Sequence, residues 1–362
     1  MRVCLSVGGQ TVFETDGPAT EVLVATAAGV ASLTHQGGST WKEQGRTLPD
    51  KHISALMIEP KGGTIFAGTH GDGIYASDDG GCSWERRDRG VEFSNIYSLN
   101  AVAIGDELRL YAGTEPAHIY TSRDGGRSWE ELPTLRSAPS LPQWTFPAPP
   151  HEAHVKHITF DPRSADVIYA SVEVGAALKS YDAGNTWREM HGFYEDVHRV
   201  VVPPAAPDRL YITGGDGVYF SADAGDTWEH LTDTTARIAY PDALVVHPEQ
   251  PDLVFMAGAI CSPGAWRQRG TADARIGRSR DGGRTWEYLE RGLPTHIHGN
   301  VEAMTLNVWP GGMALFAGTT DGDLFHSSDQ GDSWTTIASA LPPVSKSGHY
   351  RNIPPLEAVG AR

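Results

Sequence analysis

One short pattern dominates this sequence and returns along most of its length. The pattern is Ser-x-Asp-x-Gly-x-Ser/Thr-Trp, and its first intact copy runs from Ser77 to Trp84. Five further intact copies run from Ser122 to Trp129, Ser180 to Trp187, Ser221 to Trp228, Ser279 to Trp286 and Ser327 to Trp334. A degraded copy runs from Thr34 to Trp41 and has Gln36 where the others have Asp. Repeats in such strict register constrain the fold more than any other feature of the chain.

The residue types of the pattern predict a tight turn between two strands. The Asp carboxylate can accept backbone N–H bonds, and the Gly adopts a positive φ without steric cost. The Trp then begins the next strand as a large apolar anchor. Successive Trp anchors are about forty to sixty residues apart, which is typical of propeller blades that bury their faces only against neighbours. Counting the degraded copy, the anchors predict an all-β fold, a seven-bladed β-propeller that occupies residues 1–362 as one domain.

The pattern resembles the Asp-box, or BNR repeat, and the resemblance spans residues from about Thr34 to Trp334. Asp-box propellers include sialidases, sortilin-type receptors, tandem-propeller xyloglucanases and photosystem II assembly factors. A sialidase would imply six blades, an arginine triad, a Tyr nucleophile paired with Glu, and an Arg-Ile-Pro motif. This chain lacks Arg-Ile-Pro, and its arginines are scattered, as at Arg199, Arg267 and Arg351. The xyloglucanases use two propellers around a cleft, and the assembly factors, similar in length and blade count, are exported to a lumenal compartment.

Composition argues against several partners. The formal net charge is −16, which disfavours a nucleic-acid groove or an anionic membrane surface, because both require clustered Lys and Arg. The three cysteines, Cys4, Cys82 and Cys261, are scattered and do not predict a disulfide framework. The first residues lack the apolar run of a signal peptide, and no stretch is apolar over the length that spans a bilayer. We therefore expect a cytoplasmic protein that binds a small-molecule substrate.

Polar residues recur where each predicted inner strand begins. The first position of the aligned strands is occupied by His52, Asn95, His154, Asp196, Tyr240 and Asn300. The position two residues later is occupied by Ser54, Tyr97, Lys156, His198, Asp242 and Glu302. Because residues i and i+2 of a strand point the same way, we expect two stacked polar layers at one mouth of the central channel. Ser and Asn alone would suit a wet channel wall, so this many acidic and basic groups favours a functional site.

Two long segments interrupt the regular spacing of the repeats. The insertion 134–153 lies between a fourth strand and the next inner strand, and the insertion 259–276 lies between a second and a third strand. By strand order, both belong to the face on which the inner strands begin, opposite the boxes. Long loops in compact domains frequently form lids or binding surfaces. We expect both insertions to overhang the polar layers, with Trp144 and Trp266 as aromatic walls.

Histidines are concentrated around the first polar layer, and imidazole with carboxylate groups suits a divalent metal such as zinc or manganese. The predicted metal ligands are His154, His198 and His298. The predicted catalytic residues are Asp196, Asp242, Glu302, Lys156 and Tyr240. The carboxylates would complete coordination or act as general base, and Lys156 or Tyr240 would stabilise developing negative charge. The predicted substrate-binding residues are Trp144, Phe146, Trp266, Arg267, His52, Asn95 and Asn300.

These assignments predict a metal-assisted hydrolase or lyase that acts on a small polar, carbohydrate-like substrate at the channel mouth. The alternative is a non-catalytic propeller that serves as a protein-binding or assembly scaffold. The fold cannot separate the two, because the same architecture hosts both.

Overall fold

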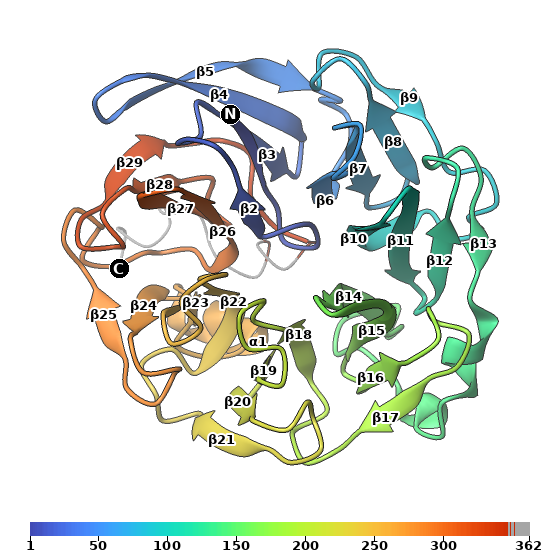
Figure 1. Ribbon diagram of the computed structural model, residues 1–362. Helices are drawn as coiled ribbons and strands as arrows, with labels where there is room; N and C mark the ends of the chain where they lie inside the picture. Colours follow the sequence, from blue (N-terminus) through green and yellow to red (C-terminus); the bar gives the residue numbers. More distant parts are fainter. Residues whose placement is uncertain (347, 349–350, 352–362) are drawn as a thin grey trace.

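The computed structural model describes residues 1–346, 348 and 351, and these residues form a ring of seven β-sheets around a central channel (Figure 1). Each sheet is one blade, and the blades are numbered 1 to 7 in chain order. The predicted fold class, an all-β seven-bladed propeller, is confirmed. None of the helices in this part of the chain is long and apolar enough to cross a lipid bilayer.

Within each blade the strands run in order from the channel to the rim. Blades 1 and 2 contain β1 (Arg2–Leu5), β3 (Glu21–Thr26), β4 (Gly29–Gly37) and β5 (Thr40–Thr47), then β6 (Ile53–Ile58), β7 (Ile65–Thr69), β8 (Ile74–Ser77) and β9 (Glu85–Arg86). Blades 3 and 4 contain β10 (Asn95–Ile104), β11 (Glu107–Glu115), β12 (Ile119–Ser122) and β13 (Glu130–Glu131), then β14 (His154–Asp161), β15 (Ser164–Glu173), β16 (Ala176–Ser180) and β17 (Arg188–Met190).

The remaining blades follow the same order. Blades 5 and 6 contain β18 (Val197–Val201), β19 (Leu210–Gly214), β20 (Gly217–Ser221) and β21 (Glu229–Thr232), then β22 (Tyr240–Val246), β23 (Val254–Ala259), β24 (Arg275–Ser279) and β25 (Glu287–Leu289). Blade 7 contains β2 (Val12–Glu14), β26 (Val301–Trp309), β27 (Gly312–Thr319), β28 (Leu324–Ser327) and β29 (Thr335–Ala338). The insertions carry the short helices η1 (Pro133–Ser137), η2 (Leu141–Gln143) and α1 (Pro263–Arg269).

The N-terminal segment closes the ring by contributing strands to two blades. β1 is the innermost strand of blade 1 and runs parallel to β3, whereas β2 lies at the inner edge of blade 7, parallel to β26. The hydroxyl of Thr305 in blade 7 also donates to the backbone carbonyl of Cys4 in blade 1 at 2.8 Å. The repeat pattern could not show which terminus closes the ring. The structure shows that the N-terminus joins the last blade to the first.

The loop between β1 and β2 crosses the channel. The backbone of Gly8 makes hydrogen bonds of 3.0 Å to both blade 2 and blade 3, and Arg199 of blade 5 donates to the carbonyl of the preceding residue at 2.7 Å. A Cβ atom on Gly8 would lie 1.7 Å from the carbonyl oxygen of Tyr97, and one on Gly9 would lie 1.8 Å from that of Leu56. The loop therefore packs backbone to backbone against the inner strands, and only glycine fits at these two positions.

Each intact box is a turn built around its Asp. In blade 6, Asp281 Oδ1 accepts hydrogen bonds from the Ser279 hydroxyl at 2.7 Å and the Thr285 N–H at 2.9 Å. Asp281 Oδ2 accepts from the Thr285 hydroxyl at 2.6 Å, and the Gly283 N–H donates to Ser279 at 2.7 Å. The same bonds recur in the other five intact boxes. Blade 1, which has Gln36 instead, continues β4 and β5 into a hairpin whose register shifts at two places.

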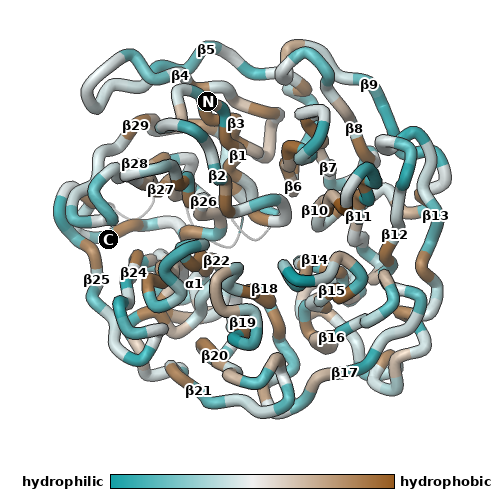
Figure 2. Tube along the Cα trace, in the orientation of Figure 1, coloured by the Kyte–Doolittle hydropathy of each residue, from teal (hydrophilic) through white to brown (hydrophobic). Residues whose placement is uncertain are grey.

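Apolar side chains fill the space between the blades. The inner strands are buried on both faces, as in β6 and β22, whereas the outermost strands β9 and β13 are largely exposed. Figure 2 shows the same division, with hydrophobic stretches along the inner strands and hydrophilic residues around the rim. The box Trp residues close the outer part of the core, and Trp129 has only 3% of its surface exposed.

We expect Trp129→Ala to destabilise the fold strongly. Its indole N–H donates to the carbonyls of Arg87 at 2.9 Å and Gly126 at 3.1 Å, and truncating a buried Trp typically costs about 3–5 kcal/mol. Urea unfolding would measure the loss. Arg127→Ala, an exposed change in the same box, should stay within about 0.5 kcal/mol of wild type. Similar unfolding midpoints for the two variants would contradict the structural role of the box.

Gly9→Ala tests the loop that crosses the channel. The added methyl group has no space beside the Leu56 carbonyl, so the backbone must shift, and overpacking of this kind typically costs about 1–3 kcal/mol or more. Gly17→Ala is the matched control, because a Cβ atom added there would meet no other segment within 4 Å. Thermal unfolding should separate the variants, and an unchanged melting temperature for Gly9→Ala would show that the loop does not pack in the channel.

Candidate functional site

A β-bulge interrupts the inner strand of every blade from 2 to 7. In each case the register against the second strand shifts at one residue, and these residues are Ser54, Tyr97, Lys156, His198, Asp242 and Glu302. They are the residues of the second predicted polar layer. A bulged residue is left unpaired and its side chain can be aimed away from the regular pleat. Repeating the bulge around the ring brings these side chains together at the start of the channel.

Glu173, at the end of β15, is the centre of a buried ionic network. Its Oε1 accepts from the ammonium groups of Lys156 at 2.9 Å and Lys346 at 2.8 Å. Its Oε2 accepts from Lys346 at 2.9 Å and pairs with His154 Nε2 at 2.6 Å. These four side chains are at most 4% exposed. Both oxygens of the carboxylate are therefore fully used by cationic or imidazole donors.

Asp242 and Glu302 extend the network toward blades 6 and 7. Asp242 Oδ1 lies 3.1 Å from Lys156 Nζ, and Asp242 Oδ2 accepts from the Asn300 amide at 2.6 Å. Glu302 Oε2 accepts from the Ser345 hydroxyl at 2.8 Å. We call Lys156, Glu173, Asp242, Glu302 and Lys346 together the channel cluster.

Burial and neighbouring charges separate the pKa values of the three carboxylates. Burial alone would raise the pKa of Glu173, but the ammonium groups of Lys156 and Lys346 outweigh it and hold the pKa well below its usual value. The same two ammonium groups lower the pKa of Asp242 against its burial. For Glu302, burial and the nearby Asp242 charge raise the pKa to about 7. The cluster thus combines two ionised carboxylates with one that titrates near neutral pH.

A pocket of about 390 Å³ lies at the channel mouth and brings the two insertions together. Its lining comprises Phe146, Pro147, Ala148, Val174, Asp196, Tyr240, Ser262, Pro263, Gly264 and Arg267. The first three come from the insertion 134–153, and the last four come from the insertion 259–276, including the start of α1. Asp196 and Tyr240 are positions of the first predicted polar layer. We call this cavity the mouth pocket.

Two polar atoms face each other below the mouth pocket. His198 Nε2 lies 3.5 Å from Asp196 Oδ1, and neither atom has a hydrogen-bond partner among the described residues. His198 Nδ1 lies 2.8 Å from the carbonyl oxygen of Pro241. Since a carbonyl can only accept, Nδ1 carries a proton, and Nε2 is the ring nitrogen that faces the Asp196 carboxylate. A hydroxyl group, a water molecule or a cation placed between Nε2 and Oδ1 could bind both atoms, so this pair is suited to exchange a proton with a ligand.

The predicted metal ligands do not converge on one point. His154 is bound to Glu173, and its ring stacks on Tyr97 with centroids 3.7 Å apart. His298 instead pairs with Asp321 at 2.6 Å. Among the described residues, the group whose potential ligand atoms lie within 4.8 Å of one another contains His198 with Asp196 and Glu173.

The fit of a divalent ion to this group is limited by Glu173. Its oxygens already accept from two lysines and a histidine, and ammonium groups beside a cation site repel the ion. His198 Nε2 and Asp196 Oδ1 are the two ligand atoms of this group that have no competing partner among the described residues. Metal binding therefore stays a prediction. Two atoms of the group, rather than three, are without a competing hydrogen bond among the described residues.

The predicted substrate-binding residues separate into three groups. Phe146 and Arg267 line the mouth pocket. Trp266 has no exposed surface and packs against Tyr240, with its indole N–H donating to a backbone carbonyl of its own loop at 2.8 Å. Our expectation that Trp266 is a ligand-facing wall is therefore wrong, because this side chain forms the core of its insertion. Trp144 is half-buried, packs into the core of blade 4 and does not line the pocket.

The other polar positions act within the wall of the channel. Asn95 donates to Glu115 at 3.2 Å, and Asn300 donates to Asp242. His52 pairs with the Ser345 carbonyl at 2.7 Å. Each of these first-layer side chains therefore positions another polar group.

Sequence reasoning missed Glu173 and Lys346. Glu173 pairs directly across from His154, at the end of the second strand where that strand reaches the same mouth. Aligning the ends of second strands would have revealed Glu173, and Glu115 in the same place on blade 3. Lys346 lies beyond the last blade, and no repeat-based alignment reaches it.

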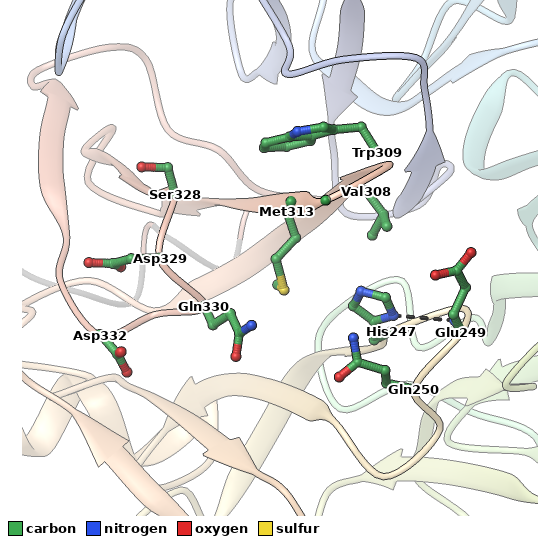
Figure 3. A pocket seen from close by; sticks show the side chains of 12 residues that line it. His247, Glu249, Gln250, Val308, Trp309, Met313, Ser328, Asp329, Gln330 and Asp332 are labelled. Atoms are coloured by element: carbon green, nitrogen blue, oxygen red, sulfur yellow. Dashed lines mark hydrogen bonds between the residues drawn. The ribbon is translucent and has the colours of Figure 1, made fainter.

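A second, more polar cavity of about 540 Å³ lies on the box side between blades 6 and 7 (Figure 3). His247, Gln250, Met313 and Gln330 are among the side chains that surround it. The hydrogen bond drawn there joins the backbone N–H of Glu249 to His247 Nδ1 at 3.2 Å. None of the residues of the two predicted polar layers lines this cavity, so we place the candidate site at the mouth pocket.

Comparisons with known proteins agree with the architecture. The family model described as Sortilin, neurotensin receptor 3 matches residues 175–302. A xyloglucanase from a Paenibacillus species is 23% identical over 227 residues, which cover 51% of this chain and 21% of the relative. The xyloglucanase Xgh74A of Acetivibrio thermocellus is 24% identical over 157 residues, or 37% of this chain and 17% of the relative. The chain thus spans about a fifth of the length of the curated relatives it matches.

Two solved structures extend the comparison. An ancestral GH74 enzyme superposes with a TM-score of 0.63 at 16% identity, covering 79% of this chain and 38% of that one. YCF48 bound to D1 peptide superposes with a TM-score of 0.51 at 16% identity, covering 90% of this chain and 88% of that one. At these identities the likeness shows the fold. The six intact boxes, the seven blades and the partial family match fit an Asp-box-like β-propeller of the BNR-repeat type.

Glu302→Gln should change the pH dependence of stability. Because the pKa of Glu302 is about 7 in the folded protein and about 4.3 in an unfolded chain, the folded state binds the extra proton between these values. Its stabilising effect is fully present below about pH 4 and is lost progressively as pH rises to about 7. We expect Glu302→Gln to raise the melting temperature at pH 8 relative to wild type and to leave it nearly unchanged at pH 4.

The groups that face Glu302 are Asp242, Lys156, Lys346 and the Ser345 hydroxyl, so the expected effect reports on the channel cluster. Glu249→Gln, an exposed carboxylate on the opposite face, serves as the control. Parallel stability profiles for Glu302→Gln and wild type from pH 4 to pH 8 would contradict the assignment.

Proposed function

We propose that the protein binds a small polar ligand rich in hydroxyl groups in the mouth pocket and catalyses its hydrolysis or an elimination from it. Asp196 takes a proton from a ligand hydroxyl group or a water molecule and returns it during the reaction, and His198 accepts that proton from Asp196 in between. The observation that carries the proposal is the pair of facing polar atoms, Asp196 Oδ1 and His198 Nε2, at the base of a pocket formed by both insertions.

Each residue has a role that follows from its position. Asp196 lines the pocket and can take a proton from a ligand hydroxyl or a water molecule. His198 is fully buried and accepts that proton through Nε2, so it is a positioning residue rather than a ligand contact. Arg267 supplies positive charge at the rim for negative charge that develops during the reaction. Phe146 offers an aromatic surface of the kind on which sugar rings pack.

The chemical balance needs only water or the ligand's own hydroxyl group. In hydrolysis, Asp196 takes a proton from water while the water oxygen bonds to the electrophilic atom of the substrate. The bond to the leaving oxygen breaks, and the proton returns from the Asp196–His198 pair to that oxygen. In elimination, the same pair removes a carbon-bound proton and delivers it to the departing hydroxyl. A divalent ion held by Asp196 and His198 would instead act as a Lewis acid.

The xyloglucanase matches support a carbohydrate as the ligand class, although they cover about a fifth of those enzymes. The second candidate function is a peptide-binding scaffold. It is favoured by the likeness to YCF48 bound to D1 peptide, which extends over about nine tenths of both chains.

The test is turnover by the purified full chain on xyloglucan oligosaccharides and aryl glycosides, with and without EDTA. We expect Asp196→Asn to lower kcat by about 10²-fold or more, as for loss of a general base. Arg267→Ala should act mainly on KM. Asp332→Asn, on the box side, is the matched control and should leave kinetics unchanged.

Four outcomes decide between the alternatives. If activity falls in the Asp196 variant and not in the Asp332 variant, the result supports Asp196 and His198 as the acid–base pair. If EDTA also removes the activity of the wild-type protein, the result supports a bound metal ion as well. If Asp196→Asn and Asp332→Asn behave alike, the site assignment is wrong. If no turnover occurs but a peptide library binds in the mouth pocket, the scaffold function replaces the enzymatic one.

A further inference from the structure

The chain segment after the last blade returns to the channel mouth. Its backbone is held by hydrogen bonds from Ala27 to the Pro343 carbonyl at 2.8 Å and from the Val344 N–H to Thr319 at 3.1 Å. Val344 is completely buried. The segment thus enters between blade 1 and blade 7, on the face where the inner strands begin.

Ser345 and Lys346 of this segment lie inside the channel cluster. Glu302 Oε2 accepts from the Ser345 hydroxyl at 2.8 Å and from the Lys346 N–H at 3.3 Å. The Lys346 ammonium group crosses to blade 4, where it binds both oxygens of Glu173, and it lies 3.8 Å from Asp242. Lys346 is 1% exposed. A side chain from outside the blades therefore occupies the centre of the channel cluster.

The blade strands contribute more carboxylates than ammonium groups to the channel cluster. Blades 4, 6 and 7 supply the carboxylates of Glu173, Asp242 and Glu302, whereas Lys156 is the one ammonium group that the described blade strands contribute to the cluster. His154 is shared between Glu173 and a second carboxylate, Glu115, at 3.5 Å. The buried guanidinium of Arg199 also acts on Asp242 but donates to the Val7 carbonyl, so the three carboxylates of the cluster face one ammonium group from the described blade strands.

We propose that the channel cluster is a binding site for a primary ammonium group and that Lys346 is its intrachain ligand. The carboxylates lie on paired strands of three blades, so they keep their positions when the ligand is removed. Lys346 follows the last strand, and the segment that carries it is held by hydrogen bonds and by the buried side chain of Val344 rather than by pairing within a sheet. An external alkylammonium ion, such as the end of a lysine side chain or an aliphatic amine, can replace it by making the same bonds to Glu173.

This inference goes beyond the proposed function, because it concerns the cluster beneath the mouth pocket and requires no turnover. If the ammonium site in the channel cluster is disproved, the proposed reaction in the mouth pocket is unaffected, and the reverse also holds. It also differs from a purely structural ion pair, in which the tail and the blades form a unit that an outside amine cannot complete.

The test uses chemical rescue in the full chain. Lys346→Ala removes the ammonium group that binds both oxygens of the buried Glu173 carboxylate. We therefore expect the melting temperature of the variant to be several degrees lower than that of wild type. Millimolar n-propylammonium chloride, which replaces the missing atoms, should restore it with a saturable dependence on concentration. Sodium chloride and tetramethylammonium chloride at the same ionic strength should not.

Two matched variants define the site. Adding Glu173→Gln to Lys346→Ala should abolish the rescue. Lys179→Ala removes another buried lysine, one that donates to the Ala224 carbonyl outside the channel, and n-propylammonium should leave it destabilised. Rescue of Lys346→Ala that does not saturate, or that sodium chloride reproduces, would overturn the proposal.

A second measurement uses the unaltered protein in case Lys346→Ala does not fold. If n-butylammonium competes with Lys346, the backbone amide of Val344 should exchange with solvent faster in its presence. Amides of the blades, such as Met256, should be unaffected. Unchanged exchange at Val344 up to about 0.1 M amine, the range of a very weak ligand, would show that Lys346 is a fixed structural ion pair and would overturn the proposal.

Discussion

A propeller blade cannot bury both of its faces alone, and this constraint explains the course of the N-terminal segment. Blades 1 and 7 would each present an apolar face to water if the ring stayed open. The chain meets the constraint by placing β1 in blade 1 and β2 in blade 7. Because the two strands lie in different sheets, separation of the blades would have to extract a strand from one of them. The six Asp-box turns add local order, but the ring depends on this closure.

The channel cluster is possible because the ring surrounds it. Moving an ionised carboxylate from water into a protein interior is costly, and the mutual attraction of opposite charges offsets the cost only in good geometry. Here the geometry is supplied by bulges at equivalent positions of six inner strands, which direct Lys156, Asp242 and Glu302 toward one axis. Since a bulged residue does not pair in the sheet, its identity can differ from blade to blade without loss of backbone hydrogen bonds.

Local patterns predicted the architecture and part of the site. Ser, Asp, Gly and Trp at fixed spacing identify the turns, because each box is formed by residues within eight positions. The alignment of inner strands also placed Lys156, His198 and Asp242 near each other. It could not show that Trp266 is buried, because the length and composition of an insertion do not determine how it folds back. Glu173 and Lys346 were missed because their roles arise from contacts between distant parts of the chain.

The loop that carries Gly8 and Gly9 blocks the axis of the ring. Its backbone lies against the inner strands too closely for even a methyl group, and the buried side chains of the channel cluster fill the axis next to it. A polymer threaded along this axis would have to displace both the loop and the cluster, so a ligand of the mouth pocket has to approach from the face that carries the insertions.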